Sequence, residues 1–294
     1  MVPAADRVSA RVQLASTRTA LAKAGIPYAW LDAEILVAHV LHVSRERLHS
    51  HPEQRLTQPQ RRQLRRLASR RAARVPVPYL TGEREFYGHM LTVSPAVLIP
   101  RPESELLVEL AIEWLNAHPA ARRVIDLGTG SGAVAIAVAK AVPQVRMVAR
   151  DVSARALRVA AANIARHRLR RRIVTVRADL LRGAHPADLI LANLPYISGK
   201  QRRVRPKELK YEPALALDGG EDGLDLIRAA LAQAPAVLAP GGGVLIECDP
   251  AQARRVVRLA QGKWPAAAVS VHKDLAGRDR VVRILLPLAD GADG

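Results

Sequence analysis

The chain has 294 residues, of which 49% are apolar, and its 45 Lys and Arg against 27 Asp and Glu give a formal net charge of +18. This length and apolar content predict one sizeable hydrophobic core and a small accessory domain. The single cysteine, Cys248, excludes an internal disulfide, and we expect it to pack as a small apolar residue at a strand end. No His/Cys cluster has zinc-ligand spacing, so no metal site is predicted.

The net positive charge indicates the kind of partner, and the N-terminal segment indicates the location of the protein. A strongly positive field favours anionic partners such as the ribosome, RNA or an acidic protein, although arginine-rich solvated faces explain the same composition. Charged residues interrupt the N-terminal segment, and no apolar run approaches the length of a membrane span. We therefore expect a cytoplasmic protein that does not bind membranes.

Residues 1–75 are predicted to form a small helical domain, because apolar positions such as Leu31, Ile35 and Leu36 recur at helical spacing and no strand alternation is present. An arginine series at nearly helical spacing predicts a basic face on its last helix, either solvated or docking a phosphate or an acidic protein. The series consists of Arg61, Arg62, Arg65, Arg66, Arg70, Arg71 and Arg74.

Residues 76–102 are predicted to be a hairpin and an extended linker. Pro76 and Pro78 interrupt the helical pattern and mark a domain junction. The stretch 79–93 alternates enough for a hairpin with Gly88 and His89 at its turn, and prolines then keep the chain extended until a helix begins near Glu103.

Residues 103–294 are predicted to be an α/β domain, in which apolar runs alternate with helical patterns. Seven strands with crossover helices indicate a doubly wound, mostly parallel sheet. The last two runs lie too close together for a helical crossover, so we expect the last strand to be antiparallel. The predicted strands lie near Val124, Val148, Val174, Ile190, Leu245, Val269 and Val282.

A glycine cluster follows the first of these strands. Gly128 and Gly130 fit the dinucleotide pattern G-x-G-x-x-G/A, with Asp151 near the spacing of a ribose-binding acid, and a plain tight turn fits as well. Gly132 gives the G-x-G-x-G spacing typical of S-adenosylmethionine (SAM) binders. Asp126 precedes the first glycine, where it could accept from the ammonium of a methionine-like group.

A second polar cluster, Asn193-Leu194-Pro195-Tyr196, follows the fourth strand. The Asn193 side chain and the Leu194 carbonyl offer two acceptors that can hold both N–H bonds of a primary amide or an exocyclic amine, and Tyr196 can stack on the planar group. The same tetrapeptide can also be a loop turn in which Pro195 fixes φ and Asn193 caps it.

Nearly the whole chain resembles the HemK/PrmC protein-(glutamine-N5) methyltransferases, which modify the glutamine of the Gly-Gly-Gln motif of peptide chain release factors. The most specific stretches are residues 78–88, 97–109, 211–225 and 273–280, which read PYLTGEREFYG, VLIPRPESELLVE, YEPALALDGGEDGLD and KDLAGRDR. The resemblance implies a SAM-dependent methyltransferase sheet, a release factor as protein substrate, and substrate recognition by the helical domain.

The resemblance also implies roles for individual residues. Asp151 would bind the ribose hydroxyls, Asp179 and Leu180 would border the adenine, and Asn193 through Tyr196 would hold the substrate glutamine. The residues expected to wrap the methionine part of SAM are Gly128, Thr129, Gly130, Ser131 and Gly132.

Two departures from the family pattern are present. Leu194 replaces the usual second proline of the acceptor motif but retains the carbonyl, and Glu247-Cys248-Asp249 replaces the usual Glu-Ile-Gly. Asn-Leu-Pro-Tyr also occurs in ribosomal-RNA adenine dimethyltransferases. An N6-adenine methyltransferase acting on ribosomal RNA or DNA is therefore the alternative, and a SAM-binding module without turnover is another.

Four cations follow the acceptor motif directly. They could guide an incoming substrate backbone or simply line a loop. They are Arg202, Arg203, Arg205 and Lys207.

Overall fold

The computed structural model describes residues 8–199 and 206–288. The chain divides into two compact units, one running to Glu83 with Lys207–Tyr211 added to it, and the other formed by the rest. Within the described ranges, no helix is both long and apolar enough to cross a bilayer.

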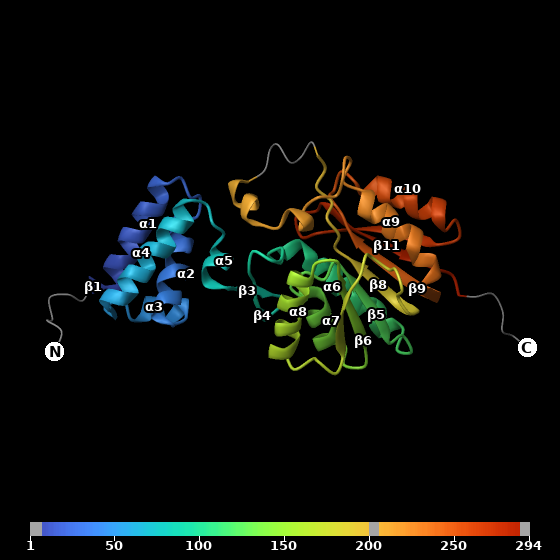
Figure 1. The fold of residues 1–294 in the computed structure, drawn as a ribbon, viewed down its shortest axis with the longest axis horizontal. Helices are drawn as coiled ribbons and strands as arrows, with labels where there is room; N and C mark the ends of the chain where they lie inside the picture. Colours follow the sequence, from blue (N-terminus) through green and yellow to red (C-terminus); the bar gives the residue numbers. More distant parts are fainter. Residues whose placement is uncertain (1–7, 200–205, 289–294) are drawn as a thin grey trace, which may run out of the picture. The chain divides into compact units, whose positions relative to one another are not determined.

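The first unit is a helical bundle (Figure 1). Its core consists of apolar side chains from one face of each helix, among them the buried leucines Leu21, Leu36 and Leu64. Two short strands, β1 (Val8–Ser9) and β2 (Arg55–Leu56), pair antiparallel, so the expectation of a purely helical segment was wrong there. The helices are α1 (Ala10–Lys23), α2 (Ala29–Leu41), α3 (Arg45–Ser50), α4 (Gln58–Ala72), α5 (Val77–Thr81) and the 3₁₀ turn η4 (Lys207–Tyr211).

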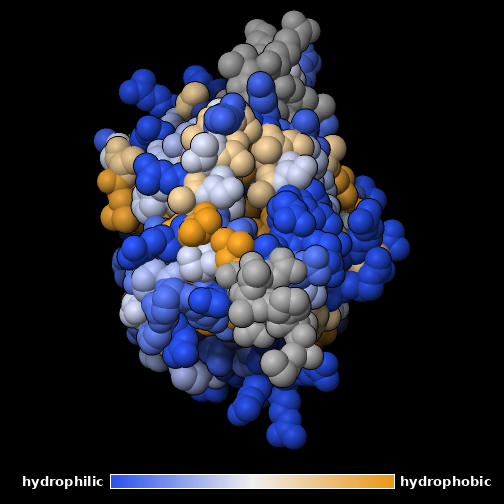
Figure 2. Space-filling model, turned by 90° about the vertical axis from the view of Figure 1, so that its left-hand side faces the viewer, coloured by the Kyte–Doolittle hydropathy of each residue, from blue (hydrophilic) through white to orange (hydrophobic). Residues whose placement is uncertain are grey.

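Helix α4 carries the arginine series. It begins with a capping box, in which Thr57 accepts from the Gln60 N–H while the Gln60 side chain accepts from the Thr57 N–H. Arg62, Arg65, Arg66 and Arg70 are exposed, and hydrophilic side chains dominate the surface seen in Figure 2.

Arg71 departs from the predicted solvated face. Its guanidinium is buried and bonds to Asp32 at 2.6 Å and to Glu208 at 3.2 Å. Arg74 donates to the Gly25 carbonyl at 2.9 Å. The C-terminal end of the arginine series therefore packs on the helical unit, because Arg71 and Arg74 each bind partners that are far away in sequence.

The predicted hairpin is shorter than expected. Its strands are β3 (Glu83–Phe86) and β4 (His89–Thr92), and the turn is Tyr87–Gly88 instead of Gly88–His89, with both residues at positive φ. Residues 77–81 are helix α5 and not strand. Pro76 and Pro78 do not break this helix, because they occupy its N-cap and first turn, where a missing N–H costs nothing.

The second unit is built on a seven-stranded sheet with the order β10-β11-β9-β8-β5-β6-β7. β11 runs antiparallel to both of its neighbours, and the pairs from β9 through β7 are parallel. The prediction of seven strands with a reversed last strand is confirmed. The strands are β5 (Arg123–Leu127), β6 (Arg146–Asp151), β7 (Ile173–Arg177), β8 (Ala187–Ala192), β9 (Leu238–Glu247), β10 (Ala268–Lys273) and β11 (Asp279–Leu285).

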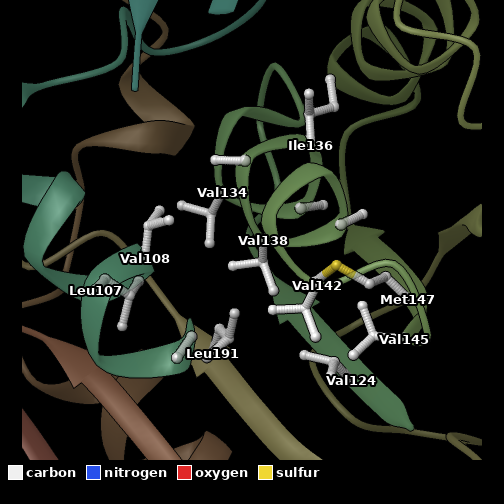
Figure 3. Close-up of a cluster of buried hydrophobic side chains, with 14 of the residues drawn as sticks. Leu107, Val108, Val124, Val134, Ile136, Val138, Val142, Val145, Met147 and Leu191 are labelled. Atoms are coloured by element: carbon white, nitrogen blue, oxygen red, sulfur yellow. The ribbon is translucent and has the colours of Figure 1, made fainter. Parts of the chain in front are cut away.

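Helices cover both faces of this sheet. One face packs against α6 (Glu105–Ala117), α7 (Ala133–Ala141) and α8 (Ala154–Arg166), and the cluster in Figure 3 lies between α6, α7 and the central strands. The other face packs against α9 (Asp225–Gln233) and α10 (Ala253–Lys263). Central strands are therefore buried on both sides, as their continuous apolar runs predict.

The chain order of the strands reverses beside β5. β6 lies on one side of β5 and β8 on the other, so the loops that leave the carboxyl ends of β5 and β8 diverge at this point. Ligands of open α/β sheets bind at such a switch point. Both polar clusters of the sequence, after Leu127 and after Ala192, lie there.

Candidate functional site

A cleft opens at the carboxyl ends of β5, β6 and β8, entirely within the second unit. The empty space in it, including the part open to solvent, is about 880 Å³. Two sets of residues meet in it: those following the strands, and those from segments 96–98 and 213–216. The predicted site residues that line it are Gly128, Gly130, Asp151, Asp179, Leu180, Asn193, Leu194 and Pro195.

Asp126 lies beneath the glycine loop. Its side chain is 2% exposed, and its Oδ2 accepts the Thr129 hydroxyl at 2.6 Å. Burial raises the pKa of Asp126 to about 6, even though bonds from Thr129 and the Ala135 backbone oppose the shift. Asp126 and Thr129 therefore brace the loop from below, and neither lines the cleft.

Asp151 connects the end of β6 to the glycine loop. Its Oδ2 accepts the Gly130 N–H at 3.0 Å and its Oδ1 accepts the Ser153 N–H at 2.8 Å. Burial raises the pKa of Asp151, although these backbone bonds favour the charged form. A carboxylate oxygen has two lone pairs, so each oxygen keeps acceptor capacity for a ligand.

Each of the three loop glycines is required for a different structural reason. A Cβ on Gly128 would lie 3.1 Å from the Asn193 carbonyl oxygen, so this glycine lets the two polar clusters touch. A Cβ on Gly130 would meet only the Gly128 carbonyl oxygen, at 3.8 Å, which leaves the cleft side open. A Cβ on Gly132 would lie 3.5 Å from Ala160 of α8, so this glycine serves helix packing.

Leu180 and Arg150 form one wall of the cleft. The buried Arg150 guanidinium donates to the Leu180 carbonyl at 2.8 Å and to the Arg182 carbonyl at 2.6 Å, which fixes the turn after β7. Leu180 itself has a φ of +49°, a conformation that this turn imposes. The Asp179 side chain is 58% exposed and lies 3.4 Å from Arg182.

The acceptor cluster is held from several sides. Asn193 Nδ2–H donates to the Ser104 hydroxyl at 2.8 Å, and Leu194 is 3% exposed within the apolar cluster beneath. The Tyr196 hydroxyl donates to Glu247 Oε1 at 3.4 Å, and burial raises the pKa of Tyr196. Tyr196 is not among the residues that line the cleft.

Residues from three of the family-specific stretches, 97–109, 211–225 and 273–280, pack near this cluster. Glu212 is buried, accepts the Ile99 N–H at 3.2 Å and pairs with Arg101, so it holds the segment that lines the cleft from the other side. Arg280 and Asp274 form a buried pair at 3.3 Å beside Glu247.

Other predicted residues lie apart from the cleft. Lys207 begins η4 in the helical unit, while Arg202, Arg203 and Arg205 lie outside the described residues. Ser131 is buried, and its carbonyl accepts from Asn163 at 2.9 Å. Cys248 packs fully buried after β9, as expected, and burial raises the pKa of its thiol to about 12.

Sequence reasoning missed Ser104, Arg150, Glu212 and Glu247 as parts of this site. Ser104 and Glu212 stand within the family-specific stretches, and Glu247 ends a strand at the same sheet edge as Asn193. Placement of strand ends on the predicted sheet was therefore a signal for Glu247. Arg150 carries no such signal, because its role is visible only once the turn after β7 lies beside the end of β6.

The donor set of this cleft fits SAM. Asp151 offers carboxylate oxygens suited to paired ribose hydroxyls, and Leu98, Val152 and Leu180 give apolar walls suited to a planar base. The open side of Gly130 leaves room for a chain that passes close to the backbone.

Comparisons with known proteins identify the family and the fold. Residues 13–82 match the PrmC N-terminal domain model and residues 104–208 match the Methyltransferase small domain model. The hMettl16 catalytic domain in complex with a MAT2A 3'UTR hairpin shares the fold, with a TM-score of 0.57 at 16% identity over 74% of this chain and 82% of that one.

Curated relatives cover almost the full length. The release factor glutamine methyltransferase of Deinococcus radiodurans is 39% identical over 90% of this chain and 93% of its own. That of Bordetella pertussis is 41% identical over 89% of this chain and 96% of its own. The chain therefore belongs to the release factor glutamine methyltransferase family and is a SAM-dependent methyltransferase.

Proposed function

We propose that this protein transfers the methyl group of SAM to the side-chain amide nitrogen, N5, of the glutamine in the Gly-Gly-Gln motif of peptide chain release factors. The observation that carries the proposal is the contact between the two polar clusters. The backbone carbonyl oxygen of Asn193 approaches Gly128 so closely that a Cβ added to Gly128 would lie 3.1 Å from this oxygen. A carboxamide held by the second cluster would thus lie beside a donor held by the first.

In the cofactor half of the site, Asp151 binds the ribose hydroxyls and Leu180 packs on the adenine, with Asp179 at its edge. Gly130 and Gly128 allow the methionine part to pass along the backbone, while Asp126, Thr129, Ser131 and Gly132 keep the loop in shape from below. The hydrogen bonds of Asp126 to Thr129 and of Asp151 to Gly130 support these separate roles in ligand binding and loop support.

In the acceptor half, Asn193 Oδ1 and the Leu194 carbonyl accept the two N–H bonds of the substrate amide, while Pro195 and Tyr196 shape the loop. Bound SAM would supply an activated methyl group for the amide nitrogen that these two acceptors hold, with S-adenosylhomocysteine as the leaving group and the nitrogen's proton released to water. Holding the amide in line contributes roughly 7–11 kcal/mol, and acceptors that bind more strongly as charge develops add to this.

The helical unit recognises the protein substrate in this proposal. It matches a family model of its own, separate from that of the catalytic domain, and it exposes aromatic side chains that are well suited to protein contacts. Tyr28 is 67% exposed and Trp30 is 49% exposed.

The test is to incubate labelled SAM with purified release factor, with the same factor carrying a substituted Gly-Gly-Gln glutamine, and with bulk RNA. We expect label only on the unsubstituted factor. Label on RNA would instead indicate an adenine methyltransferase, and SAM binding without any transfer would indicate a binding module. Label on both release factors would contradict the assignment of the glutamine.

A further inference from the structure

The chain that leaves the acceptor motif runs beside the segment 217–223. Ile197, which follows the motif, forms a parallel bridge with Asp218. The Ile197 N–H donates to the Leu217 carbonyl, and the Ile197 carbonyl accepts from the Gly219 N–H, each at 3.1 Å. The backbone just after the motif is therefore tied to a second segment of the same unit.

A buried glutamine contacts both of these segments. Gln252 directly precedes α10 and is 6% exposed. Its Nε2 donates to the Tyr196 carbonyl at 2.9 Å and to the Asp222 carbonyl at 3.2 Å, and its Oε1 accepts the Asp249 N–H at 3.3 Å. One side chain thus joins the acceptor motif, the segment beside it and the turn after β9.

The three partners leave the Gln252 amide only one orientation. The Tyr196 and Asp222 carbonyls can only accept, and the Asp249 N–H can only donate. Turning the amide over would set its oxygen against two carbonyl oxygens and its NH₂ against a donor. Gly223 is fitted to this contact, because an added Cβ would overlap both Gln252 Nε2 and the Tyr196 carbonyl oxygen.

The segment against which Gln252 holds Tyr196 is itself anchored. The Asp222 side chain pairs with Arg228 of α9 and with Arg255 of α10, so two helices fix its position. Gln252 therefore connects the Tyr196 carbonyl to a rigid part of the second unit.

The Tyr196 carbonyl is stiffly connected to the Leu194 carbonyl. Pro195, which lies between them, has a fixed φ and confines Leu194 to extended backbone, and the intervening peptide bonds are planar. Leu194 replaces a proline of the family pattern, so its own φ is not locked by a ring. A hold on Tyr196 from outside the motif makes up for this missing lock.

We propose that Gln252 is a positioning residue for methyl transfer, which holds the Tyr196 carbonyl so that the Leu194 carbonyl faces the substrate amide. This inference rests on the proposed function, in which the Leu194 carbonyl accepts one N–H of that amide. Gln252 acts through the backbone of the motif and is not among the residues that line the cleft.

The test compares two variants at saturating SAM with release factor as the varied substrate. Gln252→Ala removes the amide, whereas Gln252→Glu keeps its size and an acceptor for the Asp249 N–H but sets an oxygen against the two carbonyls. We expect each to lower kcat by about 10- to 100-fold, the scale of a slightly misplaced substrate. The KM for release factor and the SAM dissociation constant should stay within about twofold of wild type, because Gln252 belongs to neither recognition surface.

A pH profile distinguishes positioning from a general loss of structure. Protonation of the new carboxyl in Gln252→Glu restores one O–H donor toward the carbonyls. The kcat of this variant relative to wild type should therefore rise as the pH falls from about 8 to about 6, while the ratio for Gln252→Ala stays constant. The matched control is Gln261→Ala, an exposed glutamine on the same helix, which should keep the wild-type kcat at every pH.

The proposal is overturned if Gln252→Ala keeps kcat within about twofold of wild type, or if KM or the SAM dissociation constant rises in step with the fall in kcat. It is also overturned if the ratio for Gln252→Glu does not rise as the pH falls. Should Gln252→Ala fail to fold, the near-isosteric Gln252→Glu decides by the same measurements.

If wild-type protein fails to methylate release factor, the proposed function fails separately. The backbone carbonyl NMR signal of Tyr196 then decides the positioning claim. It must shift in Gln252→Glu and stay in place in Gln261→Ala, and an unmoved signal in Gln252→Glu would overturn the claim.

Discussion

The backbone N–H of Gly130 donates to Asp151 Oδ2 over 3.0 Å, so the carboxylate at the end of β6 and the loop after β5 hold each other in place. Two segments that are separated in sequence by α7 thus form one side of the cleft. Any ligand that binds Asp151 is necessarily presented to the glycine loop as well.

Replacement of Asp151 by Ala should weaken SAM binding strongly. Hydrogen bonds to a charged group contribute about 1.5–3 kcal/mol, which corresponds to a roughly 10- to 150-fold rise in the dissociation constant measured by isothermal titration calorimetry. Glu113→Gln, an exposed carboxylate outside the cleft, serves as control. An unchanged dissociation constant for Asp151→Ala would refute its assignment to the ribose.

Replacement of Asn193 by Ala should abolish methyl transfer while leaving SAM affinity mostly intact. The variant removes the side-chain acceptor but keeps the backbone carbonyl beside Gly128. Transfer to release factor is measured with labelled SAM, and binding is measured separately by calorimetry. Equal loss of both would argue that Asn193 serves the cofactor and not the substrate.

Gly128→Ala and Gly183→Ala form a matched pair, because both glycines have a positive φ, +69° and +65°. At Gly183 nothing lies within 4 Å of the added Cβ. The free energy of unfolding of this variant should therefore fall only by the cost of a left-handed conformation for alanine, roughly 1–2 kcal/mol.

The added Cβ at Gly128 would also press on the Asn193 carbonyl and the Leu194 side chain. We expect a larger loss in free energy of unfolding, by urea titration, together with loss of transfer. Equal losses in the two variants would mean that the two clusters do not need this close approach.

Asp126→Asn should stabilise the unliganded protein at neutral pH. Because burial raises the pKa of Asp126 to about 6, folding disfavours its ionised form, and wild type loses stability as pH rises from the unfolded pKa near 4 toward 6. The variant escapes this loss and should be more stable by roughly 3 kcal/mol above pH 7, with the difference vanishing near pH 4.

Urea unfolding of wild type and Asp126→Asn at pH 4, 6 and 7.5 measures this difference. Asn can still accept the Thr129 hydroxyl, so the loop contact is kept. A stability difference that does not change with pH would contradict the assignment of the charge penalty to Asp126.

Much of the fold could be predicted from the sequence, because each strand of the sheet is a short apolar run ending in polar residues. The reversal of β11 followed from the short connection after Lys273. The start of α5 could not be read in the same way, since Pro76 and Pro78 stop one helix and start another with the same chemistry.

The site was predictable only where residues follow strands. Asp151 and Asn193 lie at the expected edge, but the environment of each depends on long-range partners. Ser104 reaches Asn193 across 89 residues of sequence, and Glu247 reaches Tyr196 across 51. Local pattern contains no signal for hydrogen bonds of this kind, so the buried network could be found only in three dimensions.

The assignment of Lys207–Tyr211 to the helical unit has a consequence for engineering. The chain leaves that unit after Glu83, returns at Lys207, where Glu208 pairs with Arg71, and leaves again at Glu212. The helical unit is therefore formed by two separate segments of the chain and cannot be exchanged as one continuous segment. A chimera joined at Glu83 alone would take helices α1–α5 from one parent and Glu208, the partner of Arg71, from the other.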